Sequence, residues 1–191
     1  MTIMLYKYRG IQNFRFFVDI IMKSRLFAAT YKDLNDPMEG KYYYHHGVLD
    51  KTVVNKLASE KEDLRICSLS RRKDNELMWA HYAEGHRGVV VGLSIADKDF
   101  NIRPIDYNGI VFLASGQVHQ ATPMDILSHK LDVWSYEEEE RVFIKKRKYV
   151  YIEIKEIITG RSMSNQDFSF ISDLVHKIIP SVTIIKAETF I

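Results

Sequence analysis

The sequence predicts an α+β fold in which helices lie around a mixed, mainly antiparallel sheet. Segments that alternate polar and apolar residues, or are rich in β-branched residues, outnumber segments with helical spacing. The helical segments gather in the first half of the chain and near its end, without the regular strand–helix alternation of a parallel α/β fold. The 191 residues contain no internal repeat and no linker rich in Pro, Gly or Ser, so we expect one domain over residues 1–191.

The chain opens with a predicted strand and a predicted helix. Met4–Arg9 alternates and is β-prone, which predicts a strand. Apolar residues recur at helical spacing through Asn13–Arg25, and Asn13 can cap this helix. The next predicted elements, in chain order, are a short strand at Leu26–Thr30, a turn at Asp33–Gly40, extended chain at Tyr42–His46, a helix at Asp50–Lys61 and a strand at Leu64–Ser70.

The turn DLNDPMEG carries the pattern of a helix start. Asp36 can cap, Pro37 suits the first helical position, and Glu39 falls three residues after the cap.

The rest of the chain is predicted to be rich in strands. Asn75–Glu84 has helical spacing and is closed by Gly85, and the apolar Gly88–Ile95 is typical of a buried strand. Further strands are expected at Ile102–Tyr107, Ile110–Ala114, Glu139–Ile144, Tyr149–Ile157 and Ser181–Ala187, and further helices at Met124–Lys130 and Asn165–Ile179.

Composition excludes several classes of protein. The 27 Lys and Arg face 25 Asp and Glu, and a net charge of +2 is too small for a protein that binds nucleic acid with its whole surface. The single cysteine, Cys67, excludes an internal disulfide framework and a cysteine-based metal centre, and it fits a reducing compartment. Because the sequence lacks a secretory leader pattern and a run of about 18 apolar residues, we expect a cytoplasmic protein that does not span a membrane.

The most informative motif is Trp134–Arg141, WSYEEEER. On a strand, residues two apart share a face, so Glu137, Glu139 and Arg141 are expected on one side. The arginine can hold one carboxylate ionised, while the like charge of this carboxylate disfavours ionisation of the other. Such an arrangement suits an active site, and the alternative is a solvated acidic run that leads into a strand.

Two further polar positions lie on predicted strands. Ser68 and Ser70 share one face of LRICSLS, and their hydroxyls either bond a catalytic side chain or substrate, or face water. Cys67 lies on the opposite face and is expected to be a buried, unreactive thiol. Arg9 ends the first strand beside Gly10, where its guanidinium either clamps a phosphate or carboxylate or lies on the surface.

The remaining motifs argue against several kinds of site. His81 and His86 are five residues apart, whereas helical metal-binding pairs are four apart, so we expect no metal site. The patterns GxSxG, GxGxxG and GxxxxGK[ST] are absent, which argues against a hydrolase elbow, a Rossmann site and a P-loop. The basic stretches Arg71–Lys73 and Lys145–Lys148 either contact phosphates or form solvated turns.

The motifs LYKYR, LNDPME, MWAHYAEGHRG and WSYEEEER follow one another in an order that resembles an uncharacterised bacterial domain family, and this resemblance covers nearly the whole chain. More remotely, the chain resembles the ADP-ribosyltransferase-like superfamily. There an Arg or His on the first core strand, a Ser-bearing strand and a late Glu follow in this order, which Arg9, Ser68 or Ser70, and Glu137-x-Glu139 match here. This resemblance implies a split pair of antiparallel sheets that bind NAD in a cleft without a Rossmann motif.

The same resemblance implies an enzyme that uses NAD as a substrate and cleaves its nicotinamide–ribose bond, as a bacterial toxin or a phage-defence effector does. Glu139 then stabilises the oxocarbenium-like state, Glu137 acts as general base and Arg9 clamps the pyrophosphate. Further contacts to NAD are expected from Ser68, Ser70, Tyr82, Tyr44 and His81. The acceptor macromolecule is not identified by any motif.

Two other functions stay open. The chain can be a non-catalytic module that binds nucleic acid or protein, for example one from a defence or mobile-element locus, in which MWAHY and LNDP serve packing and capping. That reading predicts one positive surface made by Arg71–Lys73 and Lys145–Lys148. It can also be a hydrolase that uses His81 or His86 with a carboxylate.

Overall fold

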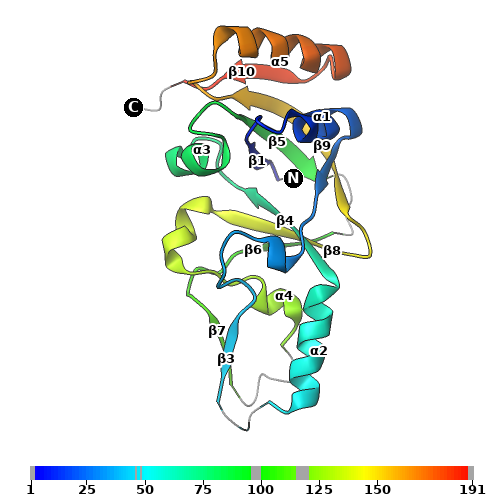
Figure 1. The fold of residues 1–191 in the computed structure, drawn as a ribbon, viewed down its shortest axis with the longest axis vertical. Coiled ribbons are helices and arrows are strands. Elements are labelled where there is room, and N and C mark those ends of the chain that lie inside the picture. The colour runs from blue at the N-terminus through cyan, green and yellow to red at the C-terminus, as the bar shows by residue number, and fades with distance from the viewer. Residues whose placement is uncertain (1–2, 46, 48, 96–99, 115–120, 189–191) are drawn as a thin grey trace. The chain divides into compact units, whose positions relative to one another are not determined.

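The computed structural model describes residues 3–45, 47, 49–95, 100–114 and 121–188. Its described strands form a mainly antiparallel sheet of eight strands and a separate two-stranded pair, with a few helices, so the predicted α+β class is confirmed (Figure 1). The contacts divide the chain into two compact units, and the expectation of one domain stays a prediction. Unit 1 comprises residues 1–26, 69–99 and 149–191, and unit 2 comprises residues 27–68 and 100–148.

In unit 1 the strand order is β10-β9-β5-β1, and β2 also pairs with β9. The central strand β5 is buried along nearly its whole length, as its apolar sequence predicts. At the outer side of β1, Tyr6 lies opposite Ser70 at the end of β4. These strands are β1 (Leu5–Arg9), β2 (Arg25–Phe27), β5 (Val89–Ile95), β9 (Tyr149–Thr159) and β10 (Thr183–Lys186).

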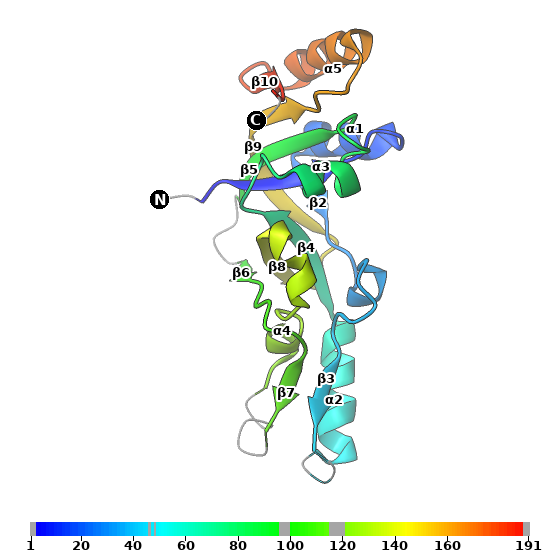
Figure 2. The ribbon, with the colours of Figure 1, turned by 90° about the vertical axis from the view of Figure 1, so that its left-hand side faces the viewer.

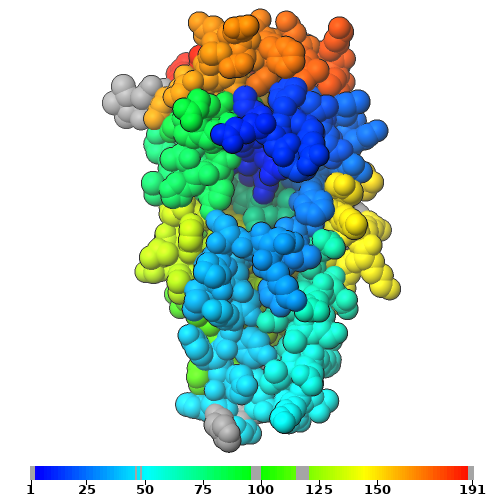
Figure 3. All heavy atoms as spheres, in the orientation of Figure 1, coloured from blue at the N-terminus to red at the C-terminus, as the bar shows by residue number. Residues whose placement is uncertain are grey.

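Three helices belong to unit 1: α1 (Phe14–Lys23), α3 (Glu76–Tyr82) and α5 (Asn165–Ile178). Figure 2 shows α5 beside β10, and Figure 3 shows α1 and α5 at the surface of this unit. The caps of α3 and α5 follow from sequence, because Asn75 accepts a hydrogen bond from the Met78 amide and Ser164 accepts one from the Asp167 amide.

The motif MWAHYAEGHRG is a packing unit of unit 1. The Trp79 ring stacks on His86 with 5.7 Å between ring centroids and meets the Tyr8 ring edge-on at 5.5 Å. The turn after α3 has positive φ at Glu84, Gly85 and His86 in succession, which brings His86 back onto Trp79. This arrangement explains the aromatic and glycine positions of the motif by packing.

In unit 2 the strand order is β4-β8-β6, and β3 and β7 form the separate parallel pair. The strands are β3 (Tyr42–Tyr44), β4 (Leu64–Ser70, of which the last two residues belong to unit 1), β6 (Asn101–Pro104), β7 (Val111–Leu113) and β8 (Glu139–Lys145). The helices are α2 (Lys51–Glu62) and α4 (Pro123–Ile126), with the short 3-10 helices η1 (Tyr31–Asp33) and η2 (Asp132–Glu137).

Two apolar clusters hold unit 2 together. One joins α2, α4 and β7 through Leu57, Ile126 and Leu113. The other joins β4 and β8 through Ile66 and Phe143, and Leu127, the residue after α4, completes it. The second cluster fixes the position of β8 and therefore of the WSYEEEER motif.

The order and type of the predicted elements are confirmed, with three differences of detail. The helix expected at Met124–Lys130 ends at Ile126, because the Lys130 amide instead donates to the Asp106 carbonyl. Asn13 precedes α1 as predicted, but its side chain makes no capping hydrogen bond to the described part of this helix. Glu137 belongs to η2, not to a strand. No helix in the described part of the chain is long and apolar enough to cross a membrane.

Candidate active site

The strand expected at Glu139–Ile144 begins at Glu139 as predicted, but Glu137 of the WSYEEEER motif lies outside it. Glu138 has a left-handed backbone (φ 41°), and β8 begins only at Glu139. The expectation that Glu137, Glu139 and Arg141 lie on one face of a strand is therefore wrong for Glu137 and right for the other two. Even so, the Glu137 carboxylate reaches the same cluster through Lys130.

Arg141 is the central cation of this cluster and is completely buried. Its Nε donates to Glu139 Oε1 at 2.7 Å and its Nη2 to Glu139 Oε2 at 3.1 Å. Its Nη2 also lies 2.5 Å from Glu39 Oε2, and its Nη1 donates to the Leu127 carbonyl at 2.6 Å. One guanidinium thus joins two carboxylates and the end of α4.

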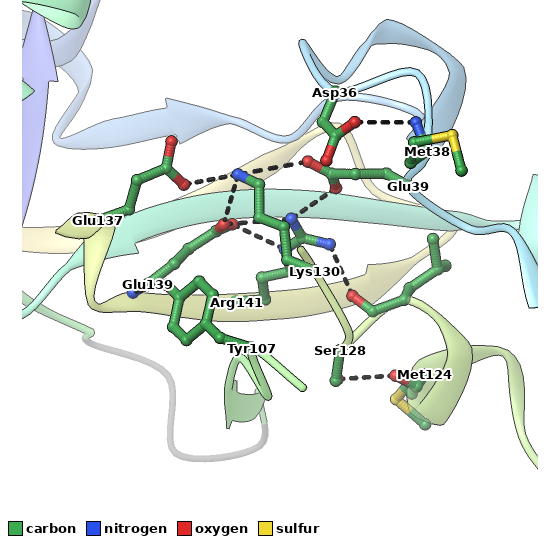
Figure 4. Close-up of polar contacts among 11 residues, drawn as sticks. Asp36, Met38, Glu39, Tyr107, Met124, Ser128, Lys130, Glu137, Glu139 and Arg141 are labelled. Carbon is green, nitrogen blue, oxygen red and sulfur yellow. Dashed lines mark hydrogen bonds and ion pairs between the residues drawn. The ribbon is translucent and has the colours of Figure 1, made fainter. Parts of the chain in front are cut away.

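Lys130 is the second cation. Its Nζ lies 2.5 Å from Glu137 Oε2, 3.3 Å from Glu139 Oε2 and 3.5 Å from Glu39 Oε1. It also lies 4.9 Å from the centre of the Trp134 ring, which is within the range of a cation–π contact. Figure 4 shows this ammonium surrounded by the three carboxylates.

Glu39 comes from the LNDPMEG turn. Asp36 shapes this turn, because its Oδ1 accepts a hydrogen bond from the Met38 amide at 2.9 Å and its carbonyl accepts one from the Glu39 amide. Gly40 follows with φ +75°, and a Cβ there would lie 3.1 Å from the Tyr31 ring. The turn therefore directs Glu39 into the cluster and leaves no room for a side chain after it.

The electrostatics of the cluster follow from burial and from its two cations. Burial raises the pKa of Glu139, but Arg141, Lys130 and a hydrogen bond from Ser68 outweigh this and lower it to about 2. Burial also raises the pKa of Glu39, and here Arg141 compensates only in part. Burial opposes the charge of Lys130, yet the neighbouring glutamates raise its pKa, so it stays an ammonium.

Two hydroxyls support Glu139. The Ser68 side chain on β4 hydrogen-bonds the Glu139 carboxylate on the neighbouring β8. The Tyr107 hydroxyl accepts a hydrogen bond from the Glu139 amide at 2.7 Å, and burial raises the pKa of Tyr107 to about 12. The strand end that carries Glu139 is thus fixed at its backbone and at its carboxylate.

The structure brings together three of the predicted site residues: Glu137, Glu139 and Ser68. Tyr44 belongs to the same unit but lies on β3, where its ring packs near that of Tyr42. The other four predicted site residues, Arg9, Ser70, His81 and Tyr82, belong to unit 1.

The unit 1 residues have surroundings of their own. The Arg9 guanidinium lies 5.1 Å from the centre of the Phe16 ring. Ser70 accepts a hydrogen bond from the Arg72 amide at 3.0 Å, and the rings of His81 and Tyr82 meet edge-on at the end of α3. The convergence of Arg9 with Glu139 stays a prediction.

Sequence reasoning missed Glu39 and Lys130 as members of the site. Glu39 was visible as part of the capping pattern in LNDPME, but that pattern pointed to a local role. Lys130 has no sequence signal, since it is one lysine in a polar connection whose side chain meets the glutamates only in the fold.

Other residues singled out by sequence form local contacts. Two of the three cations of Arg71–Lys73 are paired within unit 1, Arg72 with Asp74 at 2.7 Å and Lys73 with Glu156 at 3.1 Å. Cys67 is buried, as expected. In the described ranges, no three His, Cys, Asp or Glu side chains gather as metal ligands, and the expectation of no metal stays a prediction.

No family model matches the chain, and no curated protein or solved structure matches it. The two resemblances carried by the motifs therefore stay predictions.

Proposed function

We propose that the protein is an NAD-dependent, ADP-ribosyltransferase-like enzyme that cleaves the nicotinamide–ribose bond. The observation that carries this proposal is the pair Ser68–Glu139: a serine on one strand hydrogen-bonds an ionised glutamate on the next. These are the two residue types that the resemblance implies, in adjacent strands and in contact.

The charge state of Glu139 suits the reaction. When the glycosidic C–N bond breaks, nicotinamide leaves with the bonding electrons and positive charge builds on the ribose. A carboxylate whose pKa is about 2 is fully ionised near neutral pH and can stabilise that charge. Glu137, which shares Lys130 with Glu139, is placed to act on an acceptor hydroxyl or water as general base.

The strand order supports a role for Arg9. In unit 2, β4 neighbours β8, which carries Glu139, and in unit 1 the end of β4 pairs with β1, which ends at Arg9. In the proposed enzyme Arg9 clamps the pyrophosphate, and Ser70, Tyr44, His81 and Tyr82 contribute further contacts to NAD.

Nicotinamide release from NAD tests the proposal. We expect release by the wild type and a loss of at least about a hundredfold in Glu139→Gln, because the amide cannot stabilise the positive charge. The matched control is Glu138→Gln, the neighbouring exposed glutamate, which should keep wild-type activity. Circular dichroism and thermal unfolding check that both variants fold. If the wild type neither releases nicotinamide with any acceptor nor binds NAD in calorimetry, the proposal is overturned.

One observation favours a second candidate, a nucleic-acid-binding module. All four basic residues of Lys145–Lys148 are exposed at the turn after β8. This candidate predicts binding to an oligonucleotide that weakens steeply with salt and is lost when these four residues are changed to Gln. The pairing of Arg72 and Lys73 with acidic residues argues against a contribution from the other basic stretch.

We further propose a cytoplasmic location, which the presence of a single, buried cysteine in the sequence supports.

A further inference from the structure

The Lys130 ammonium occupies a position that has the features of a receptor for a cation. Three carboxylates surround it at 2.5, 3.3 and 3.5 Å, and the face of Trp134 closes one side at 4.9 Å. Aromatic faces combined with carboxylates are the usual recognition elements for organic cations. The Lys130 side chain is 2% exposed, so it fills this position completely.

The cluster retains an excess of negative charge even with Lys130 in place. Glu39, Glu137 and Glu139 face only two cations. Asp36 is also buried, and Figure 4 shows its carboxylate beside that of Glu39. Within the described part of the chain, Asp36 Oδ2 has no hydrogen-bond partner. A buried carboxylate oxygen without a partner is costly, so the surroundings of Lys130 favour a cation strongly, whichever cation occupies the position.

The two cations of the cluster differ in how firmly they are held. Arg141 contacts Glu139, Glu39 and the Leu127 carbonyl with all three nitrogens of a rigid fork. Lys130 holds its glutamates through one nitrogen at the end of a flexible chain. Its backbone is fixed by hydrogen bonds between its amide and the Asp106 carbonyl and between its carbonyl and the Gly109 amide. The ammonium can therefore leave while the main chain stays in place.

We infer that the Lys130 ammonium marks the binding position of a flat organic cation, the pyridinium ring of oxidised NAD, and that Lys130 fills this position until the ligand displaces it. This inference rests on the proposed function. A pyridinium can stack on Trp134 while its charge replaces that of the ammonium among the three glutamates. Displacement removes the contact of Lys130 with Glu139 Oε2, while Arg141 still donates to this oxygen at 3.1 Å.

The chain supplies a matched control, the other buried lysine of unit 2. Lys61 lies between the rings of Tyr31 and Tyr42, at 5.2 and 5.1 Å, and donates to the Gly40 carbonyl at 2.7 Å. Among the described residues, no carboxylate lies within ion-pair distance of it. Lys61 therefore has the aromatic faces of a cation site without the glutamates.

The experiment compares Lys130→Met and Lys61→Met with the wild type in thermal unfolding. One probe is 1-methylnicotinamide chloride, a pyridinium cation that has a methyl group in place of the ribose and so lacks the bond that the enzyme would cleave. The other probe is neutral nicotinamide. Each is compared with sodium chloride at the same concentration. We expect the cation alone to stabilise Lys130→Met, raising its folded-to-unfolded ratio about a hundredfold at a concentration of 100 times Kd. The cation should stabilise the wild type less than it stabilises Lys130→Met. It should stabilise Lys61→Met no more than the wild type.

Equal responses of both variants, or no response of Lys130→Met, overturn the inference. If Lys130→Met does not fold alone, refolding with 1-methylnicotinamide should recover it, and failure to do so also overturns the inference. The proposed function is tested separately. If the cation binds but the wild type does not release nicotinamide, the proposed enzymatic activity is overturned and the cation site is retained. If the wild type releases nicotinamide but the cation does not bind, the cation site is overturned and the proposed enzymatic activity is retained.

Discussion

Arg141 and Glu139 lie two residues apart on β8 and are joined by hydrogen bonds of 2.7 and 3.1 Å inside unit 2. The same guanidinium contacts Glu39 from a distant turn, so a single positive charge is shared by two buried carboxylates. Removal of the Arg141 charge would leave the buried carboxylates of Glu39 and Glu139 without their main positive partner.

Replacement of Arg141 should therefore destabilise the protein strongly. We expect Arg141→Met to lower the free energy of unfolding by about 3–5 kcal/mol, because Glu39 and Glu139 stay buried without their main partner. The control is Arg103→Met, which removes a 2.5 Å pair with Asp125 that is partly exposed and should cost less than about 1 kcal/mol. Urea unfolding measures both, and equal losses would contradict the prediction.

The low pKa of Glu139 predicts an acid dependence of stability. Its pKa falls from the ordinary value of 4.5 to about 2 on folding, so the unfolded chain binds the proton more tightly. The contribution is thus complete above about pH 4.5 and is lost as the pH falls from there to about 2. Unfolding followed between pH 6 and pH 2 should show a shallower loss in Glu139→Gln than in the wild type. The control Glu138→Gln should follow the wild type, and three parallel curves would refute the assignment.

Ser68 is expected to position Glu139 and not to react itself. Removing its hydrogen bond in Ser68→Ala should lower kcat for nicotinamide release about tenfold with little change in KM. Ser94→Ala is the matched control, because Ser94 in unit 1 also donates to a glutamate, Glu153, at 3.4 Å. Restoration of kcat by Ser68→Thr supports positioning through the hydroxyl. An Ala variant with unchanged kcat would exclude this role.

Substitution of Gly40 tests the role of the turn that directs Glu39 into the cluster. Gly40→Ala combines a left-handed backbone (φ +75°) with contacts of 3.1 Å to Tyr31 and 3.2 Å to Leu127, and should cost about 2–3 kcal/mol. Gly109→Ala has φ +94° but nothing within 4 Å of the new Cβ, so it isolates the backbone cost of about 1–2 kcal/mol. The difference between the free energies of unfolding of the two variants, measured by thermal unfolding, gives the steric cost of the Cβ at Gly40. A Gly40 variant no less stable than the Gly109 variant would mean that the turn has space to relax.

Sequence patterns predicted the elements better than the site. Alternation located β1, and apolar residues at helical spacing located α1 and α3, because these signals are local. The same locality placed Glu139 and Arg141 on one strand face. It failed for Glu137, whose neighbours form a 3-10 turn, and for Lys130, which meets its glutamates only through tertiary contacts.

The division of the chain into interleaved segments affects how it is made. Unit 1 draws on residues 1–26, 69–99 and 149–191, so β1 leaves the ribosome well before its partner β5, and β9 follows only after all of unit 2. β8 is synthesised long after β4, so Ser68 can hydrogen-bond Glu139 only late in synthesis. Neither unit can complete its hydrogen bonding during synthesis of the first two thirds of the chain. The nascent polypeptide therefore exposes unpaired strand edges until β8 and β9 have been synthesised.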